Sequence, residues 1–250
     1  MEIKLTLDGN EYTCDLSNPL DISIPVRDGL QNVNCFYAPP VEFSPVLAGN
    51  FIGDTRQGGV VNFFNIKINP HGNGTHTECV GHITKERYYI NECLDRYIFP
   101  ATVISVWPTK NGNGDRVITK DQVEALFDGG TPALVIRTLP NDELKKEINY
   151  SGANPPYLDV EATAYLVRKG VDHLLIDLPS VDREEDEGAL ASHKAFWNYE
   201  GSLRTNCTIS ELIFVPEMIK DGIYLLNIQI ASLELDVSPS KPILYALTPD

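Results

Sequence analysis

The chain alternates between short apolar runs and segments with helical periodicity, and this alternation restricts its fold most. Apolar runs of strand length occur at 60–68, 101–107, 132–139 and 171–180. Residues 119–128 begin with Thr119 and Gln122 at capping-box spacing, which predicts a short helix. Residues 158–170 place apolar side chains at helical spacing and end in Lys-Gly. Strands connected by helices predict an α/β fold with a mixed β-sheet and flanking helices.

The rest of the chain fits the same architecture. Residues 2–16 indicate a hairpin around Asp8-Gly9, and 18–59, rich in Pro, Asn and Gly, predict long loops with short strands. Residues 189–196 predict the start of a helix, and further strands are expected at 210–217, 222–235 and 241–247. Because no Ser/Gly-rich linker divides the chain, we expect one domain spanning residues 1–250.

Composition indicates a soluble globular protein, with 42% hydrophobic and 22% charged residues. No apolar run is long enough for a transmembrane helix, and the N-terminus lacks the features of a secretory signal. The five cysteines follow no paired spacing, so free thiols in a reducing cytoplasm are expected. The net charge of −15 argues against a nucleic-acid partner. The acidic run at 182–188 is interpreted as a solvated loop.

Residues 70–83, PHGNGTHTECVGHI, contain His71, His76 and His82, three of the five histidines, together with Glu78. On an extended backbone His76 and Glu78 point to the same side, so both can reach one ion. Imidazoles and carboxylates are ligands of Zn²⁺ and Mn²⁺, and the loop needs at least one further ligand from elsewhere. The alternative is a polar Gly-rich turn that happens to collect histidines, and spacing alone does not exclude it.

Residues 74–82, GTHTECVGH, resemble the signature His-x-Gly-Thr-His-x-Asp-x-Pro-x-His of the cyclase family. This family of metal-dependent hydrolases includes kynurenine formamidase and isatin hydrolase. Further segments are similar to later parts of the family pattern, in the same order: GVDHLLIDLPSVD (170–182), ASHKAF (191–196), and the closing strands from Ser210 onward. The resemblance covers most of the chain from about Asn62. This resemblance implies that the chain folds as a swivelling β/β/α-type domain, as in the cyclase family.

The chain departs from the signature at three positions. The family Asp is Glu78, which is one methylene longer but can still ligate or bridge two ions. The family Pro is Val80. The first His of the signature aligns with Gly72, and His71 is displaced by one residue. His71 could still reach a metal if the turn carries a one-residue bulge.

The resemblance implies a metal site of one or two Zn²⁺ or Mn²⁺ ions. His71, His76 and Glu78 would hold one ion, and Glu78 would bridge to a second ion held by His193 and Glu211. His82 would be the catalytic acid/base residue. Taken alone, His193 could be an exposed helix residue and Glu211 a solvent-facing or capping residue.

Other residues near the motif have structural interpretations. His173 is interpreted as structural, and Cys79 as pointing away from Glu78 without a nucleophilic role. Three residues are candidate hydrogen-bond partners of the ligands or, equally, parts of a buried strand and turn: Asp177, Ser180 and Asp182. Residues 35–51, rich in proline and aromatics, are a candidate pocket wall or subunit contact, or a packed surface loop.

The resemblance implies a metal-dependent hydrolase that cleaves a non-peptide amide, either an N-formyl arylamine or a cyclic amide, through metal-activated water. A metal-dependent cyclase or dehydratase acting on another carbonyl compound is one alternative. A non-catalytic binding protein with a decayed metal site is another, given the displaced His71 and the Asp-to-Glu change. The expected partners are a small-molecule substrate and further copies of the chain in a dimer or tetramer, with no nucleic acid and no membrane.

Overall fold

A computed structural model describes residues 1–7 and 9–249 of the chain. One large mixed sheet has the strand order β1-β2-β17-β16-β9-β12-β14-β15-β8, and β3 pairs with β17. Its strands are β1 (Glu2–Leu7), β2 (Asn10–Asp15), β3 (Leu20–Asp21), β8 (His76–Glu78), β9 (Ile98–Val106), β12 (Ala133–Thr138), β14 (His173–Ile176), β15 (Thr208–Glu211), β16 (Gly222–Ile230) and β17 (Val237–Pro249). These findings confirm the mixed α/β class.

Strand β17 closes this sheet on itself because it pairs with β8 as well as with β16. Four neighbouring strands, β9, β12, β14 and β15, are parallel, as expected for strands joined by helical connections. Every residue of β12 is buried, and its side chains alternate between two hydrophobic clusters. Leu134 and Ile136 pack in one cluster, and Ala133 and Val135 pack in the other.

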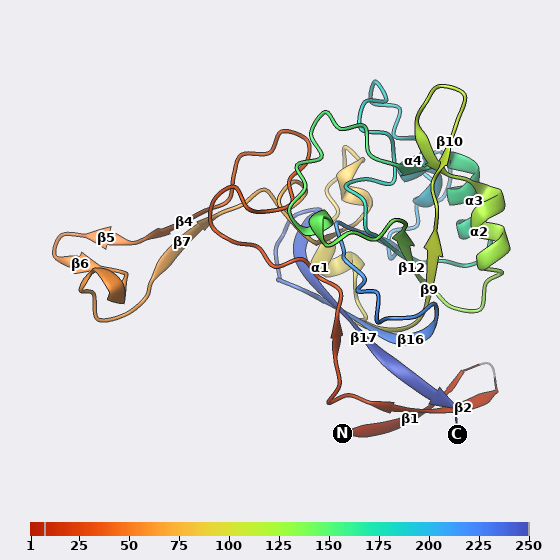
Figure 1. Cartoon of the computed structure of the whole chain (residues 1–250), viewed down its shortest axis with the longest axis horizontal. Coiled ribbons are helices and arrows are strands. Elements are labelled where there is room, and N and C mark those ends of the chain that lie inside the picture. Colours follow the sequence, from red (N-terminus) through yellow and green to blue (C-terminus); the bar gives the residue numbers. More distant parts are fainter. Residues whose placement is uncertain (8, 250) are drawn as a thin grey trace.

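The three longer helices cover one face of the parallel strands, and the shortest helix packs in the hydrophobic cluster on the other face. The helices are α1 (Ile90–Cys93), α2 (Lys120–Leu126), α3 (Val160–Arg168) and α4 (Ala191–Phe196), with 3-10 turns at Thr55–Gln57, Val80–His82 and Glu143–Lys146. Figure 1 shows α2, α3 and α4 grouped together beside the parallel strands. The predicted capping box of α2 is present, with reciprocal bonds between Thr119 and Gln122. No described helix is long and apolar enough to cross a membrane.

Residues 42–67 form a projecting arm, which Figure 1 shows extending far from the sheet. The arm contains β4 (Glu42–Pro45), β5 (Leu47–Ala48), β6 (Phe51–Ile52) and β7 (Phe64–Lys67), and β4 pairs with β7. The apolar run at 60–68 predicted one strand, but only Phe64–Lys67 is extended and all four residues are exposed. Because this strand lies outside the main sheet, its apolar residues do not enter the core.

Other boundaries also differ from the sequence prediction. The strand expected at 210–217 is Thr208–Glu211, because the backbone turns at Leu212, whose φ is 53°. The strand expected at 222–235 ends at Ile230, and residues 231–236 form a loop. A small sheet pairs β10 (Thr109–Lys110), β11 (Arg116–Ile118) and β13 (Tyr157–Leu158). The hairpin of β1 and β2 is confirmed, although Asp8 lies outside the described residues. All five cysteines are free thiols, as expected.

Candidate metal centre

Strand β8 carries two of the predicted ligands and is held on both sides. Its register places His76 opposite Glu211 of β15, and Glu78 opposite Val237 of β17. His76 and Glu78 are two residues apart and both fully buried, so the extended backbone directs them to one side as the sequence predicted. Glu211 is the last residue of β15, and its Oε1 accepts a hydrogen bond from the Val181 backbone N–H at 2.9 Å.

Each buried imidazole of this centre uses Nδ1 to contact an oxygen of the surrounding fold. His76 Nδ1 lies 2.9 Å from the Gly74 carbonyl oxygen, and His76 Nε2 lies 3.4 Å from Glu211 Oε2. His193 Nδ1 lies 2.6 Å from Asp182 Oδ2, and His193 Nε2 lies 3.2 Å from Glu78 Oε1. When an oxygen accepts the Nδ1 proton, Nε2 keeps the lone pair that a metal ion requires.

Asp182 positions His193 through the start of helix α4. Its carboxylate accepts hydrogen bonds from the backbone N–H groups of Ser192 and His193, at 2.7 and 3.1 Å, in addition to the contact with His193 Nδ1. Asp182 is buried, so the prediction that residues 182–188 are a solvated loop is wrong at this position. Its carboxylate is turned inward because His193 and the helix N–H groups need an acceptor.

His71 reaches the cluster despite its displacement from the family signature. His71 Nδ1 lies 3.1 Å from Glu78 Oε2. The neighbouring Gly72 has no room for a side chain, because an added Cβ would lie 2.3 Å from the Cβ of Ala38. An imidazole at position 72 is therefore incompatible with this packing, and His71 supplies the ring instead.

His82 lies at the edge of the cluster, with 30% of its side chain exposed. Its Nδ1 is 3.7 Å from Glu78 Oε2 and 3.5 Å from Asp236 Oδ2. Asp236 was not among the predicted site residues. It is 165 positions from His71 in the sequence and directly follows the strand predicted at 222–235, so no local signal indicated it.

Opposite charges stabilise the protonated form of the imidazoles in this cluster. Burial opposes the charge on His71 and His193, but their hydrogen bonds to Asp236, Asp182 and Glu78 outweigh it and raise each pKa to about 10. Burial also opposes ionisation of Glu78, yet His82, His193 and His71 hold the pKa of this carboxyl well below its usual value. The protons of these rings occupy positions from which a metal ion would displace them.

The donor set fits a divalent metal ion. Within the described residues, ligand atoms of His71, His76 and Glu78 lie within 4.8 Å of one another, as do those of Glu78, His82 and His193. Among the described residues, His76 Nε2 and Glu78 Oε2 are buried and make ion-pair contacts but no hydrogen bond. Buried polar atoms are costly when unpaired, and a metal ion between them would satisfy both.

A cavity of about 210 Å³ lies over this cluster. Its lining includes His71, His82, His193 and Glu211, with the exposed ring of Phe36 and residues of the 180–190 segment. Phe36 belongs to the segment 35–51 proposed as a pocket wall, whereas residues 42–51 of that segment lie in the arm. The cavity gives a small molecule access to the imidazoles and carboxylates.

The remaining predicted residues lie outside the cluster. Asp177 bonds the Thr138 N–H and Lys145 Nζ rather than a ligand, and Ser180 accepts the Asp182 N–H. A hydrogen bond with Cys93, together with burial, raises the pKa of the Cys79 thiol, which disfavours a nucleophilic thiolate. His173 packs on Phe99 with ring centroids 3.9 Å apart, in keeping with its structural interpretation.

Comparison with known proteins identifies the family. The sequence profile of the Cyclase family matches residues 14–183, which is more than half of the chain. The chain belongs to the Cyclase family. The matched range includes the loop with His71, His76, Glu78 and His82 and ends before His193 and Glu211, the other two predicted ligands.

This Cyclase-family chain is similar in sequence to a kynurenine formamidase and in fold to two solved structures. It is 27% identical over 194 residues to kynurenine formamidase of Bacillus cytotoxicus, covering 77% of this chain and 84% of that protein. Isatin hydrolase A from Labrenzia aggregata aligns with a TM-score of 0.67 at 12% identity, over 92% of this chain and 93% of that one. A protein described as a potential metal-dependent hydrolase with cyclase activity aligns with a TM-score of 0.67 at 16% identity, over 91% of this chain and 97% of that one. These two structures establish the shared fold.

Proposed function

We propose that the chain is a metal-dependent hydrolase that cleaves a non-peptide amide bond in a small molecule. The observation that carries this proposal is the convergence of His71, His76 and His193 with the buried carboxylates Glu78 and Glu211 beneath one cavity. Two of the buried ligand atoms, His76 Nε2 and Glu78 Oε2, make ion-pair contacts but no hydrogen bond among the described residues. Burying polar and charged groups is unfavourable unless they are bonded, and coordination to a divalent ion would provide those bonds.

The proposed roles follow the positions of the side chains. His71, His76 and Glu78 would hold one ion, and Glu78, His193 and Glu211 a second. A bound divalent ion would supply activation of water and polarisation of the substrate carbonyl. His82 would move a proton between water and the leaving nitrogen, because it borders the cavity and remains partly exposed. The donor set suits Zn²⁺ or Mn²⁺.

The proposed substrate is an N-formyl arylamine or a cyclic amide. The names of two relatives describe a formamidase and an isatin hydrolase. In this chain, Phe36 offers an aromatic surface beside the imidazoles, and a cavity of about 210 Å³ suits a substrate with one or two rings. The lining carries several carboxylates, Glu184 and Asp186 among them, against one guanidinium, Arg183, and this excess of negative charge disfavours a substrate with several negative charges.

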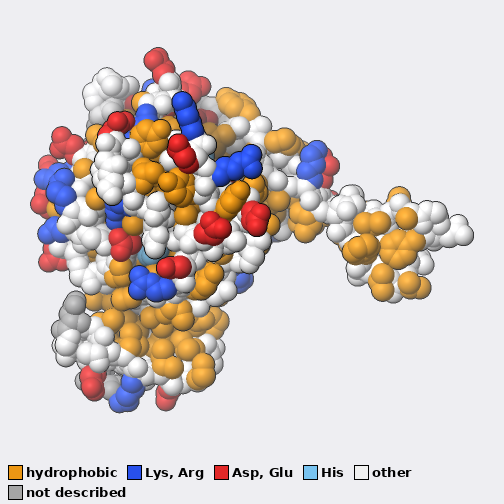
Figure 2. All heavy atoms as spheres, turned by 180° about the vertical axis from the view of Figure 1, so that it is seen from behind, with side chains coloured by type: hydrophobic (Ala, Val, Ile, Leu, Met, Phe, Trp, Pro, Cys, Tyr) orange, Lys and Arg blue, Asp and Glu red, His pale blue; other side chains and the backbone are white. Residues whose placement is uncertain are grey.

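We further propose a homo-oligomer, a dimer or tetramer, in the cytoplasm, with residues 1–250 as one domain. The arm supports self-association because large apolar side chains gather on it without a core beneath them. Figure 2 shows these side chains on the projecting segment. The most exposed of them are Leu47, Val60, Phe63 and Ile66. Exposed apolar surface of this kind is typical of protein interfaces.

Metal content and hydrolysis, measured together, test the proposed function. The protein would be purified without added metal, loaded with Zn²⁺ or Mn²⁺, and analysed by mass spectrometry, then assayed on N-formyl arylamines and isatin. We expect one to two ions per chain in the parent and loss of metal and activity in His76→Ala. His173→Gln is the matched control, since it removes a histidine outside the cluster and should retain its metal. A parent chain that holds neither metal would overturn the proposal.

A further inference from the structure

Asp236 is fixed beside the metal centre by the pairing of β17 with β8. It immediately precedes Val237, the residue opposite Glu78, and its carbonyl oxygen accepts the Cys79 backbone N–H at 2.9 Å. Its side chain is 29% exposed. The backbone therefore holds this carboxylate at a set position relative to Glu78, although it belongs to a loop.

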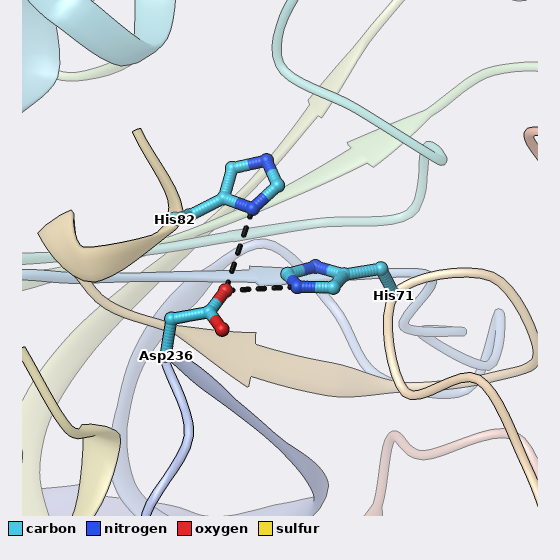
Figure 3. A group of neighbouring side chains, drawn as sticks. All are labelled: His71, His82 and Asp236. Atoms are coloured by element: carbon cyan, nitrogen blue, oxygen red, sulfur yellow. Dashed lines mark hydrogen bonds and ion pairs between the residues drawn. The ribbon is translucent and has the colours of Figure 1, made fainter. Parts of the chain in front are cut away.

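The carboxylate of Asp236 contacts two imidazoles at once. Figure 3 shows it between His71 and His82. Asp236 Oδ2 lies 2.9 Å from His71 Nε2 and 3.5 Å from His82 Nδ1. The opposite nitrogen of His71, Nδ1, lies 3.1 Å from Glu78 Oε2. The imidazole of His71 is thus held between two carboxylates, one on the side of the proposed ion and one on the far side.

The other two histidines are also held by an oxygen on the far side of the ring. The Gly74 carbonyl oxygen contacts Nδ1 of His76, and the Asp182 carboxylate contacts Nδ1 of His193, so the other nitrogen of each ring is left for the ion. His76 and His193 present Nε2, whereas His71 presents Nδ1 and gives Nε2 to Asp236. An outer carboxylate of this kind fixes the ring and increases the basicity of the coordinating nitrogen.

We propose that Asp236 is the positioning residue that makes the displaced His71 a metal ligand. This inference rests on the metal centre of the proposed function. Because Ala38 leaves no space for a side chain at position 72, the imidazole must come from His71, which lies at the rim with 27% of its side chain exposed. A ring at the rim has less packing to restrain it, and Asp236 supplies that restraint while also facing His82.

Chelator competition with Zn²⁺ tests this role without relying on activity. Asp236→Asn should weaken one of the stepwise Zn²⁺ affinities about 10- to 100-fold. Asp236→Glu, which keeps the charge but moves the carboxylate, should weaken it less. Glu234→Gln is the matched control, because it makes the same charge change in the same loop and should leave the affinity unchanged. The absorption spectrum of the Co²⁺-loaded protein should change in Asp236→Asn and remain unchanged in Glu234→Gln.

A double variant separates positioning from a general effect. If Asp236 acts through His71, Asp236→Asn should cost no further affinity in a His71→Ala background. An equal loss in both backgrounds, or parent-like affinity in Asp236→Asn, would overturn the inference while leaving the proposed hydrolase intact. A parent that binds Zn²⁺ but hydrolyses none of the amides would instead overturn the function alone. A parent that binds no metal would overturn both.

Discussion

The histidines of this protein differ in pKa according to the groups that surround them. His71 and His193 face carboxylates and are stabilised as cations, whereas His173 is buried between Phe99 and the hydroxyl of Thr208. Burial lowers the pKa of His173 to about 4, from an ordinary value of 6.5. Facing carboxylates therefore favour the cationic form of this residue type, and burial in the apolar core favours its neutral form.

The buried neutral His173 should make stability depend on pH. Between pH 6.5 and 4 the unfolded chain binds a proton at this position and the folded chain does not, so the free energy of unfolding falls as pH falls. This contribution amounts to ~3 kcal/mol at most. In urea unfolding at pH 7 and pH 4, His173→Gln should gain stability relative to the parent as pH decreases. A constant difference between the two proteins would contradict the assignment.

At the scale of elements, helix α4 and strand β8 bring the two halves of the centre together. Helix α4 is only six residues long, and its first turn depends on Asp182 rather than on a capping residue of its own, because Leu190 at its start has a left-handed backbone. The carboxylate that anchors this turn also orients His193. Anchoring of the helix and orientation of His193, a proposed ligand, are therefore coupled.

Asp182→Asn should disturb both properties. It replaces one of the accepting oxygens by an amide donor, so we expect a loss of about 1–3 kcal/mol in the free energy of unfolding. We also expect roughly tenfold weaker Zn²⁺ binding, because His193 loses its orienting carboxylate. Urea unfolding and chelator competition measure the two effects. Glu185→Gln, an exposed neighbour in the same loop, is the control. Unchanged metal affinity in Asp182→Asn would exclude an orienting role.

Elements with strong local periodicity were predictable from the sequence, and contacts between distant segments were not. The boundaries of α2 and β12 agree with the prediction to within a few residues, because a capping box and a fully apolar run are local signals. The loop with His76 and Glu78 was recognised from the family signature. Asp236 was missed, because its role depends on the pairing of β17 with β8. The strand predicted at 60–68 is only Phe64–Lys67 and is exposed, because an apolar run does not report what covers a strand.

At the scale of the whole molecule, the arm is notable because it projects from the main sheet and exposes large apolar side chains. Its four charged residues form two ion pairs, Asp54 with Arg56 at 3.2 Å and Glu42 with Lys67 at 3.4 Å. The arm is therefore close to neutral in a chain with a net charge of −15. A neutral apolar arm is suited to contact another acidic copy of the chain without charge repulsion.

Charged substitutions on the arm should dissociate the proposed oligomer. The parent should have a mass that is a multiple of 27.8 kDa, and the double variant Val60→Asp/Ile66→Asp should approach 27.8 kDa. Light scattering coupled to size exclusion measures this. Val160→Asp, at another exposed apolar position, is the control and should leave the mass unchanged. A monomeric parent, or an unchanged mass in the double variant, would contradict the role of the arm.

The closure of the sheet by β17 has a consequence for how the protein is made. His71 and Asp236 are 165 positions apart, and ribosomes extend a chain by about 5–20 residues per second. The nascent chain therefore carries its first three histidines for on the order of ten seconds before Asp236 is synthesised. An ion captured in that interval would meet an incomplete set of donors. Stable metal uptake should accordingly follow the docking of the last strand, after translation of this region is finished.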